Sequence, residues 1–243
     1  MPGSPSLTRA VYAAALVIAP TLLLGALLVD ITPQADDTGE LLGLIAERPA
    51  MWSTGQMLFF LSAIAWVPAG LALIRLFGPR AKAGRLGGAA VLLGGLAILP
   101  VDAAGLYLSK LATSGVPLEE QVAVVEGVEG SVAVIVFETV HVIGLFIGML
   151  VVAVALLRRR TVPVWVPAAL ILAFVGLLAA PNRVVEMSAM GLMVLGLGMA
   201  GARLLRMSDH EWREGASGGR EERDGTPPAL ARVALTGRGD LLE

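Results

Sequence analysis

The sequence predicts an all-α, polytopic membrane protein with six transmembrane helices. Of its 243 residues, 56% are hydrophobic and only 16% are charged, and the hydrophobic residues are gathered into six long runs. Each run is close to the ~20 residues that a helix needs to cross a hydrocarbon core. A soluble fold would have no means of covering so much apolar surface. The runs cover residues 10–29, 52–74, 86–108, 131–157, 162–180 and 184–205.

The first run is interpreted as an uncleaved span and not as a signal peptide. A signal sequence has an apolar region of ~7–15 residues followed by a cleavage site of small residues. Here the apolar stretch is longer, only Arg9 precedes it, and residues 27–30 (Leu-Leu-Val-Asp) do not form such a site.

The distribution of positive charge predicts that both termini are cytoplasmic. Ten Lys and Arg residues fall on one side of the six runs and three on the other, and the more basic side of a membrane protein is the cytoplasmic one. An even number of spans independently requires both termini on one side. The first set is Arg9, Arg75, Arg80, Lys82, Arg85, Arg158, Arg159, Arg160, Arg203 and Arg206, and the second is Arg48, Lys110 and Arg183.

Short helices are expected in the first and second outer loops. In the first loop, Asp37 and Glu40 have the spacing of a capping box, ahead of an apolar stretch that ends near Pro49. In the second, Pro117 precedes residues 118–125 and suits the first turn of a helix. These helices either lie on the lipid headgroups or form a lid over an outward-facing cavity.

Residues 1–206 are predicted to form the six-helix transmembrane domain, and residues 207–243 a disordered cytoplasmic tail, because the tail mixes both charges with Gly and Pro. The formal net charge of −2 argues against a nucleic-acid partner. The absence of Cys removes thiol nucleophiles and Cys-ligated metals. Neither a catalytic motif nor a cofactor-binding motif is recognisable, and no cofactor is expected.

Small residues predict close helix packing, because helix contacts in lipid are enriched in them. Gly144 and Gly148 form a Gly-x-x-x-Gly pair, and further glycines crowd the third and sixth runs. Besides the lipid bilayer, such faces suit a membrane-protein partner or a second copy of the chain. The further glycines are Gly87, Gly88, Gly94, Gly95, Gly191, Gly196, Gly198 and Gly201.

Polar and ionisable residues inside the runs or at their outer ends are the candidate functional site, because such groups are costly in hydrocarbon. All fall in the outer half of their runs, and helical periodicity places each on a face that packs inward. We therefore expect them to meet at one outer-leaflet polar centre, with Glu138 and His141 sharing a proton or an ion pair. The set is Gln56, Asp102, Glu138, His141, Arg183 and Glu186.

Three interpretations of this cluster remain open. It is a structural hydrogen-bond network that holds the bundle together, or a proton or substrate site in a small-solute transporter or in an accessory or sensor protein. Alternatively, Asp102, Glu138 and His141 serve a membrane-embedded metal site or enzyme, since Glu-x-x-His is a metal-ligand spacing in helical bundles.

The layout also resembles a family of small bacterial six-helix integral membrane proteins of unknown function. The resemblance rests on the acidic first loop with a short helix at residues 41–48, on residues 56–77 closing in Leu-Ile-Arg-Leu-Phe, and on residues 140–178. The last stretch contains His141, Gly144, Gly148, an Arg-rich turn and Pro163. The resemblance covers residues 9–206 and implies a fold and a location in the bacterial plasma membrane, with no reaction attached. The composition is typical of a high-GC bacterium such as an actinobacterium.

Overall fold

The computed structural model describes residues 6–78, 81–179 and 182–214, and its regular elements are all helical over these ranges. In chain order they are α1 (Leu7–Val29), η1 (Thr32–Gln34), α2 (Thr38–Glu47), α3 (Pro49–Phe77), α4 (Lys82–Ala112), α5 (Leu118–Glu129), α6 (Val132–Val142), η2 (Ile143–Ile147), α7 (Gly148–Arg159), α8 (Trp165–Leu178), α9 (Arg183–Arg206) and α10 (Asp209–Glu214). The all-α prediction is confirmed over these ranges.

Five helices of the described chain are long and apolar enough to cross a membrane. They are α1, α3, α4, α9 and the continuous helix formed by α6, η2 and α7. The run expected at residues 162–180 differs, because its helix α8 has 14 residues and so a length of about 21 Å. A hydrocarbon core is about 30 Å thick. Ala180, the end of that run, lies outside the described residues.

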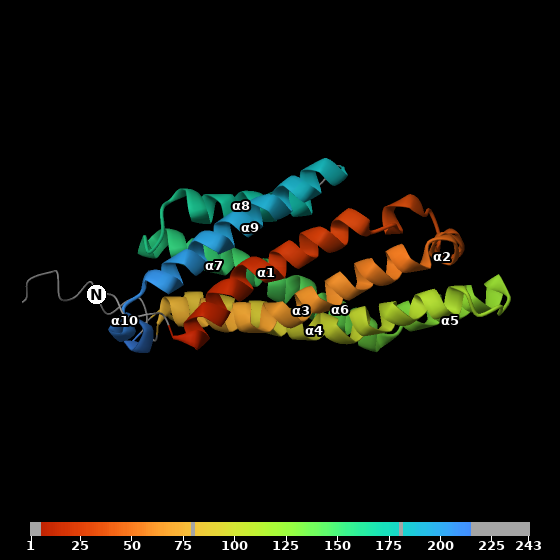
Figure 1. The fold of residues 1–243 in the computed structure, drawn as a ribbon, viewed down its shortest axis with the longest axis horizontal. Coiled ribbons are helices and arrows are strands. Elements are labelled where there is room, and N and C mark those ends of the chain that lie inside the picture. The colour runs from red at the N-terminus through yellow and green to blue at the C-terminus, as the bar shows by residue number, and fades with distance from the viewer. Residues whose placement is uncertain (1–5, 79–80, 180–181, 215–243) are drawn as a thin grey trace, which may run out of the picture.

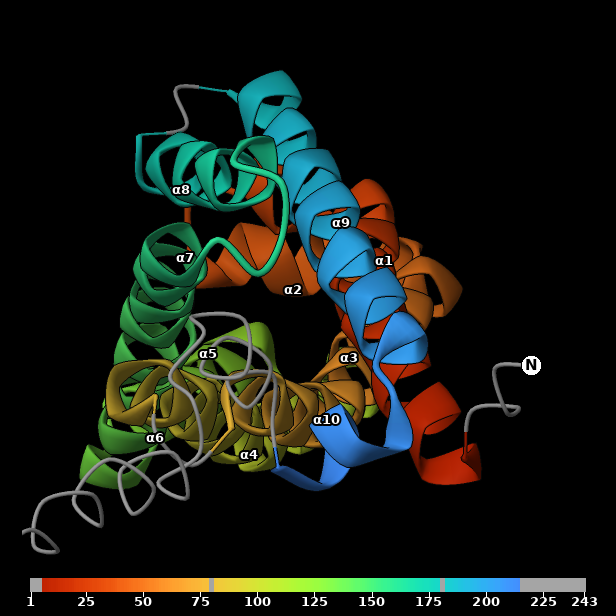
Figure 2. The same cartoon turned by 90° about the vertical axis from the view of Figure 1, so that its left-hand side faces the viewer.

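The long helices form a ring, and each is antiparallel to the next (Figures 1 and 2). Its order follows from the contacts: α1 lies against α3, α3 against α4, α4 against α6, η2 and α7, α7 against α8, α8 against α9, and α9 against α1. We name the two ends of the ring by the short helices found there. At the α2–α5 end lie both loop helices, and at the α10 end lies the short C-terminal helix (Figure 1).

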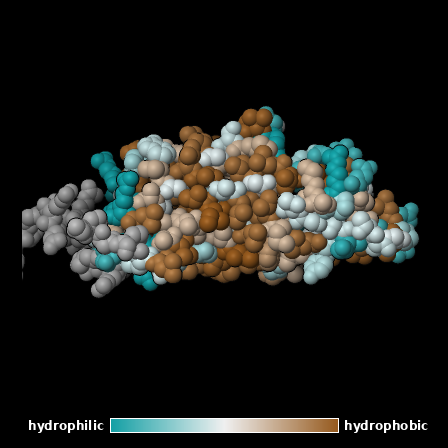
Figure 3. Space-filling model, viewed as in Figure 1, coloured by the Kyte–Doolittle hydropathy of each residue, from teal (hydrophilic) through white to brown (hydrophobic). Residues whose placement is uncertain are grey.

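Apolar side chains fill the ring toward the α10 end. Trp66 and Leu73 of α3, Leu156 of α7 and Leu197 of α9 are all fully buried in one cluster. Seen from one face, the surface is apolar across the middle of the molecule and hydrophilic at the two ends (Figure 3). This distribution is that of a bundle whose middle is surrounded by lipid.

The backbone of α4 touches the backbone of η2 and α7 at glycine residues, as the glycine pattern predicts. A Cβ atom added to Gly144 would lie 2.7 Å from the carbonyl oxygen of Ala90, and one added to Gly148 would lie 2.9 Å from that of Gly87. On the other helix, a Cβ atom on Gly94 would lie 2.6 Å from the amide nitrogen of Leu145. The predicted close packing is therefore confirmed for the contact of α4 with η2 and α7.

The two expected loop helices are present as α2 and α5. Asp37 caps α2 by accepting a hydrogen bond of 2.7 Å from the amide of Glu40, and Glu40 accepts one of 2.7 Å from the amide of Asp36. Pro117 precedes the first residue of α5. The helices α2 and α5 contact each other across the end of the ring.

At the opposite end, α10 connects the two ends of the described chain. Arg9 of α1 is only 3% exposed; it donates a hydrogen bond of 2.6 Å to the carbonyl of Met207 and forms an ion pair with Asp209. Its guanidinium lies 5.5 Å from the ring centroid of Trp212, close enough for a cation–π interaction. Residues 209–214 belong to the segment expected to be disordered, so the helix α10 is a correction to that expectation. Residues 215–243 of the predicted tail, like Arg80, lie outside the described residues.

Candidate functional site

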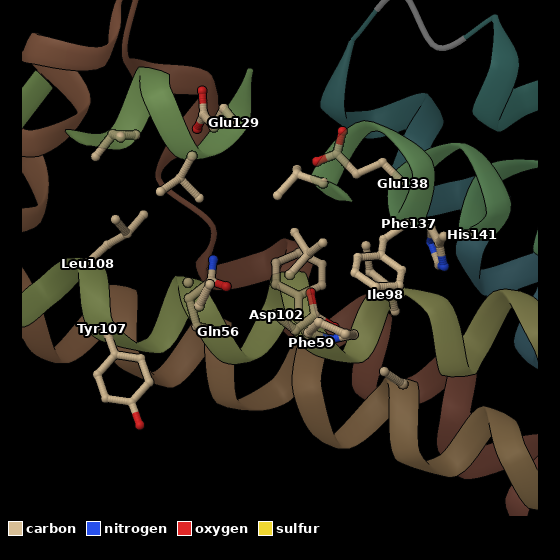
Figure 4. Close-up of a pocket in the computed structure, with 18 of the residues that line it drawn as sticks. Gln56, Phe59, Ile98, Asp102, Tyr107, Leu108, Glu129, Phe137, Glu138 and His141 are labelled. Atoms are coloured by element: carbon tan, nitrogen blue, oxygen red, sulfur yellow. The ribbon is translucent and has the colours of Figure 1, made fainter. Parts of the chain in front are cut away.

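A cavity of about 600 Å³ opens among α3, α4, α5 and α6 in the half of the ring near the α2–α5 end. Its walls are mainly apolar, and four of the six residues expected in the polar centre line it: Gln56, Asp102, Glu138 and His141. Figure 4 shows them around one space, with Asp102 and Glu138 on opposite sides, and Phe59, Ile98 and Phe137 also line it. The structure thus brings together polar groups from three helices.

His141 is held by a backbone carbonyl and not by a carboxylate. Its Nδ1 donates a hydrogen bond of 3.0 Å to the carbonyl oxygen of Gly94. This contact is possible because Gly94 has no side chain: an added Cβ atom would come within 3.0 Å of the His141 carbonyl oxygen. The tight crossing of α4 and α6 therefore also fixes the imidazole.

Glu138 does not form the expected pair with His141. Among the described residues Glu138 has neither an ion pair nor a hydrogen bond through its side chain, and it is exposed. Its carboxylate and the His141 ring project from α6 in different directions (Figure 4). Residues three apart lie on the same side of a helix, but they need not point at each other when one of them has a better partner on a neighbouring helix.

A π-helical turn separates the cavity from the closely packed half of the ring. η2 begins at Ile143, two residues after His141, and ends before Gly148. On one side of it α6 has no buried residue, whereas on the other side α7 buries Met149, Val152 and Leu156 among others. Single π-helical turns within α-helices are frequent at functional sites. The sequence carried no recognisable signal for this turn.

The side chain of Gln56 also packs against a glycine, which leaves room for it. A Cβ atom on Gly105 of α4 would lie 2.3 Å from Oε1 of Gln56, so the amide group occupies the space that a side chain would take. One turn earlier on α3, Nε1 of Trp52 donates a hydrogen bond of 2.9 Å to the carbonyl of Gly105. Together these contacts hold the polar end of α3 against α4.

Arg183 and Glu186 lie elsewhere, so the expected single polar centre is wrong for these two residues. Arg183 is 3.3 Å from Glu186 on the same helix and 3.5 Å from Asp30, which follows the last residue of α1. Three charges thus connect the ends of α1 and α9. Asp30 was missed because sequence reasoning placed it in the first loop, where an acidic residue needs no partner.

The second loop contributes to the cavity. The sequence had left undecided whether its helix lies on the headgroups or covers a cavity. Val124, Val125, Val128 and Glu129 of α5 line it, while Gln121 is buried and donates a hydrogen bond of 2.7 Å to the carbonyl of Val116. Of the two interpretations of the loop helices, this geometry favours the lid for α5. Glu129 is a cavity residue that sequence reasoning missed, since it lies in a loop with several other acidic residues.

The metal interpretation gains no support from the geometry. Within the described ranges, no three His, Asp or Glu side chains lie close enough to one another to hold a metal ion. Asp102 and Glu138 lie on opposite sides of the cavity (Figure 4), and His141 already directs Nδ1 at Gly94. The arrangement suits a ligand large enough to occupy the space between these groups.

Comparison with family models, with curated proteins and with solved structures found no match for this chain.

Proposed function

We propose that this protein is a six-span membrane protein that binds a small, largely apolar solute in its cavity from the outer side of a bacterial plasma membrane, as one step of transport. In this proposal the α10 end faces the cytoplasm and the α2–α5 end faces outward. The observation that carries it is the cavity that extends to His141.

The proposed orientation is supported by the charges at the ends of the ring. Arg9, Arg75, Lys82, Arg158 and Arg206 all belong to helix ends at the α10 end (Figure 1), which makes that end the cytoplasmic one. The short helix α8 runs antiparallel to both of its neighbours, α7 and α9. A sixth crossing by α8 together with its connections leaves both chain ends on the cytoplasmic side.

Solute binding is supported by the size and the lining of the cavity. About 600 Å³ falls within the ~300–1,000 Å³ of ligand sites, which are mostly apolar with a few polar groups. A bundle held together only by its polar network has no need of such a space. The filled core toward the α10 end closes the path on that side, as expected for the outward-facing state of a transporter.

A pair of Trp substitutions tests the proposal in proteoliposomes. Ala133 of α6 lines the cavity, whereas Ala168 of α8 is exposed and does not line it. We expect uptake of at least one member of a panel of labelled apolar amines, alcohols and carboxylic acids above that of empty liposomes. Ala133→Trp should abolish this uptake, and Ala168→Trp should leave it unchanged. The proposal fails if no member of the panel is taken up, or if both variants transport equally.

A further inference from the structure

The lining of the cavity identifies the charge of its ligand. We infer that the cavity binds a hydrophobic organic cation, such as a quaternary ammonium or phosphonium compound with apolar substituents. This inference rests on the proposed function, because it names the chemical class of the bound solute.

The charged groups of the cavity wall are all acidic apart from one imidazole. Carboxyl groups reach it from three helices, Asp102 from α4, Glu129 from α5 and Glu138 from α6, and no Lys or Arg is among the described residues that line it. No described Lys or Arg forms an ion pair with any of the three. Elsewhere in the described chain, four acidic residues have Arg partners: Asp30, Glu186, Asp209 and Glu211. The acidic residues in and before α2, and the other acidic residues of α5, have no ion pair with a described residue, but they lie at the hydrophilic end of the molecule.

An unpaired carboxylate near hydrocarbon is costly, and a cation close to it removes much of that cost. Asp102 is half-buried on α4 and Glu138 faces it from the other side of the cavity (Figure 4). A cation placed between them is attracted by both. An anion of the same shape is repelled by both, and a neutral molecule gains nothing from either.

The space between the two carboxyl groups is apolar and aromatic. Phe59, Phe137 and Ile98 line the cavity that contains it (Figure 4), and the faces of aromatic rings attract cations. A small hydrated cation such as Na⁺ would have to give up its water to these walls. A bulky organic cation carries little ordered water and fills the cavity with apolar groups.

Binding of two ions with one shape and opposite charge tests the inference. Tetraphenylphosphonium is the cationic probe, tetraphenylborate is its anionic counterpart, and triphenylphosphine oxide is a neutral analogue. Equilibrium dialysis on the purified full-length chain in lipid nanodiscs measures the three labelled probes in separate samples, because the two ions would pair with each other in a mixture, and empty nanodiscs give the binding to lipid. We expect saturable binding of the cation that neither of the other two probes shows, and that Ala133→Trp abolishes.

Carboxyl variants connect this binding to the cavity. Glu138→Gln and Glu129→Gln should each weaken tetraphenylphosphonium binding about tenfold, and both residues are exposed, so their replacement does not threaten the fold. Glu126→Gln is the matched control, because Glu126 lies on α5 without lining the cavity; binding should be unchanged. Asp102→Asn should weaken binding at least as much, and Asp102→Glu should restore part of it.

The outcomes separate this inference from the function on which it rests. If tetraphenylborate or triphenylphosphine oxide binds as well as the cation and Ala133→Trp abolishes that binding, the cavity binds solutes but the inference about charge is overturned. If tetraphenylphosphonium does not bind, or binds equally to Glu126→Gln and Glu138→Gln, the inference is overturned too, and uptake of the wider panel still decides the proposed function.

Discussion

Nδ1 of His141 on α6 lies 3.0 Å from the carbonyl oxygen of Gly94 on α4. This hydrogen bond lies next to η2, where α6 beside the cavity continues into the closely packed α7. The acceptor is a backbone carbonyl that α4 offers at a glycine contact. His141 therefore contributes to the position of α6 whatever else it does in the cavity.

The first prediction concerns the independence of His141 and Glu138. Because His141 bonds to Gly94 and Glu138 has no described side-chain partner, Glu138→Gln should not lower the melting temperature in detergent. His141→Leu removes one hydrogen bond and should cost about 1 kcal/mol. In a double-mutant cycle the coupling energy between the two changes should stay below about 0.5 kcal/mol. A coupling well above this value would mean that the two side chains form a buried pair.

The second prediction compares two glycines that differ in what lies beside them. Gly94→Ala places a Cβ atom 2.6 Å from the backbone nitrogen of Leu145, so α4 and η2 must separate, at a cost of about 1–3 kcal/mol. Gly191 of α9 has nothing within 4 Å of that position, and Gly191→Ala should gain up to about 1 kcal/mol in helix propensity. Thermal unfolding in detergent measures both. Equal melting temperatures for the two variants would contradict the close helix contact.

The third prediction is a pH dependence at the α10 end. Partial burial acts to raise the pKa of Glu211. Hydrogen bonds from the Ser208 amide and the Arg203 guanidinium lower the pKa by more than burial raises it, so the pKa lies below the ordinary value of 4.5. A lowered pKa in the folded state stabilises the fold above the unfolded-state value, and this stabilisation is lost as the pH falls below it.

Glu211→Gln isolates this effect. At pH about 7 the variant should be less stable than the parent by about 0.2–1 kcal/mol, the range of exposed ion pairs. As the pH falls below 4.5, the ordinary pKa of a glutamate, the two proteins should converge, because Glu211 of the parent becomes protonated. A difference in melting temperature that stays constant between these pH values would contradict the assigned hydrogen bonds.

The fourth prediction tests the orientation in the membrane by labelling of introduced thiols, since the chain has no Cys of its own. Gly43→Cys on α2 and Glu119→Cys on α5 should react with an impermeant maleimide in intact cells. Ala83→Cys, at the start of α4 and exposed, should react only after permeabilisation. The reverse pattern would invert the proposed topology.

The length and apolarity of the runs were sufficient to predict the five long helices, because lipid imposes both on a span. The fifth run contains only the shorter helix α8. Partners were harder to predict. Helical periodicity placed Glu138 and His141 on one inward face, and we therefore expected them to pair. It could not reveal that the backbone carbonyl of Gly94 on a neighbouring helix binds the imidazole instead. Arg183 and Glu186 were assigned to the same centre because depth along a helix says nothing about which neighbour lies beside it in the ring.

The helix α10 shows the same limit. Residues 209–214 have the composition of a disordered segment, and they are ordered because Arg9, far away in the sequence, forms an ion pair with Asp209 and a cation–π contact with Trp212. No pattern within the segment reports a partner about 200 residues away. Local composition therefore predicts local order only where tertiary contacts do not override it.

The accessibility of position 141 tests the central claim most directly. If the cavity opens to the outside, His141→Cys should react with a membrane-impermeant thiosulfonate added to intact cells, and Ala133→Trp in the same chain should slow that reaction. Leu195→Cys is the control, because Leu195 is 61% exposed on α9 outside the cavity; in lipid its thiol stays protonated and unreactive. A His141→Cys chain that stays unlabelled, while Glu119→Cys reacts, would contradict an outward-facing cavity.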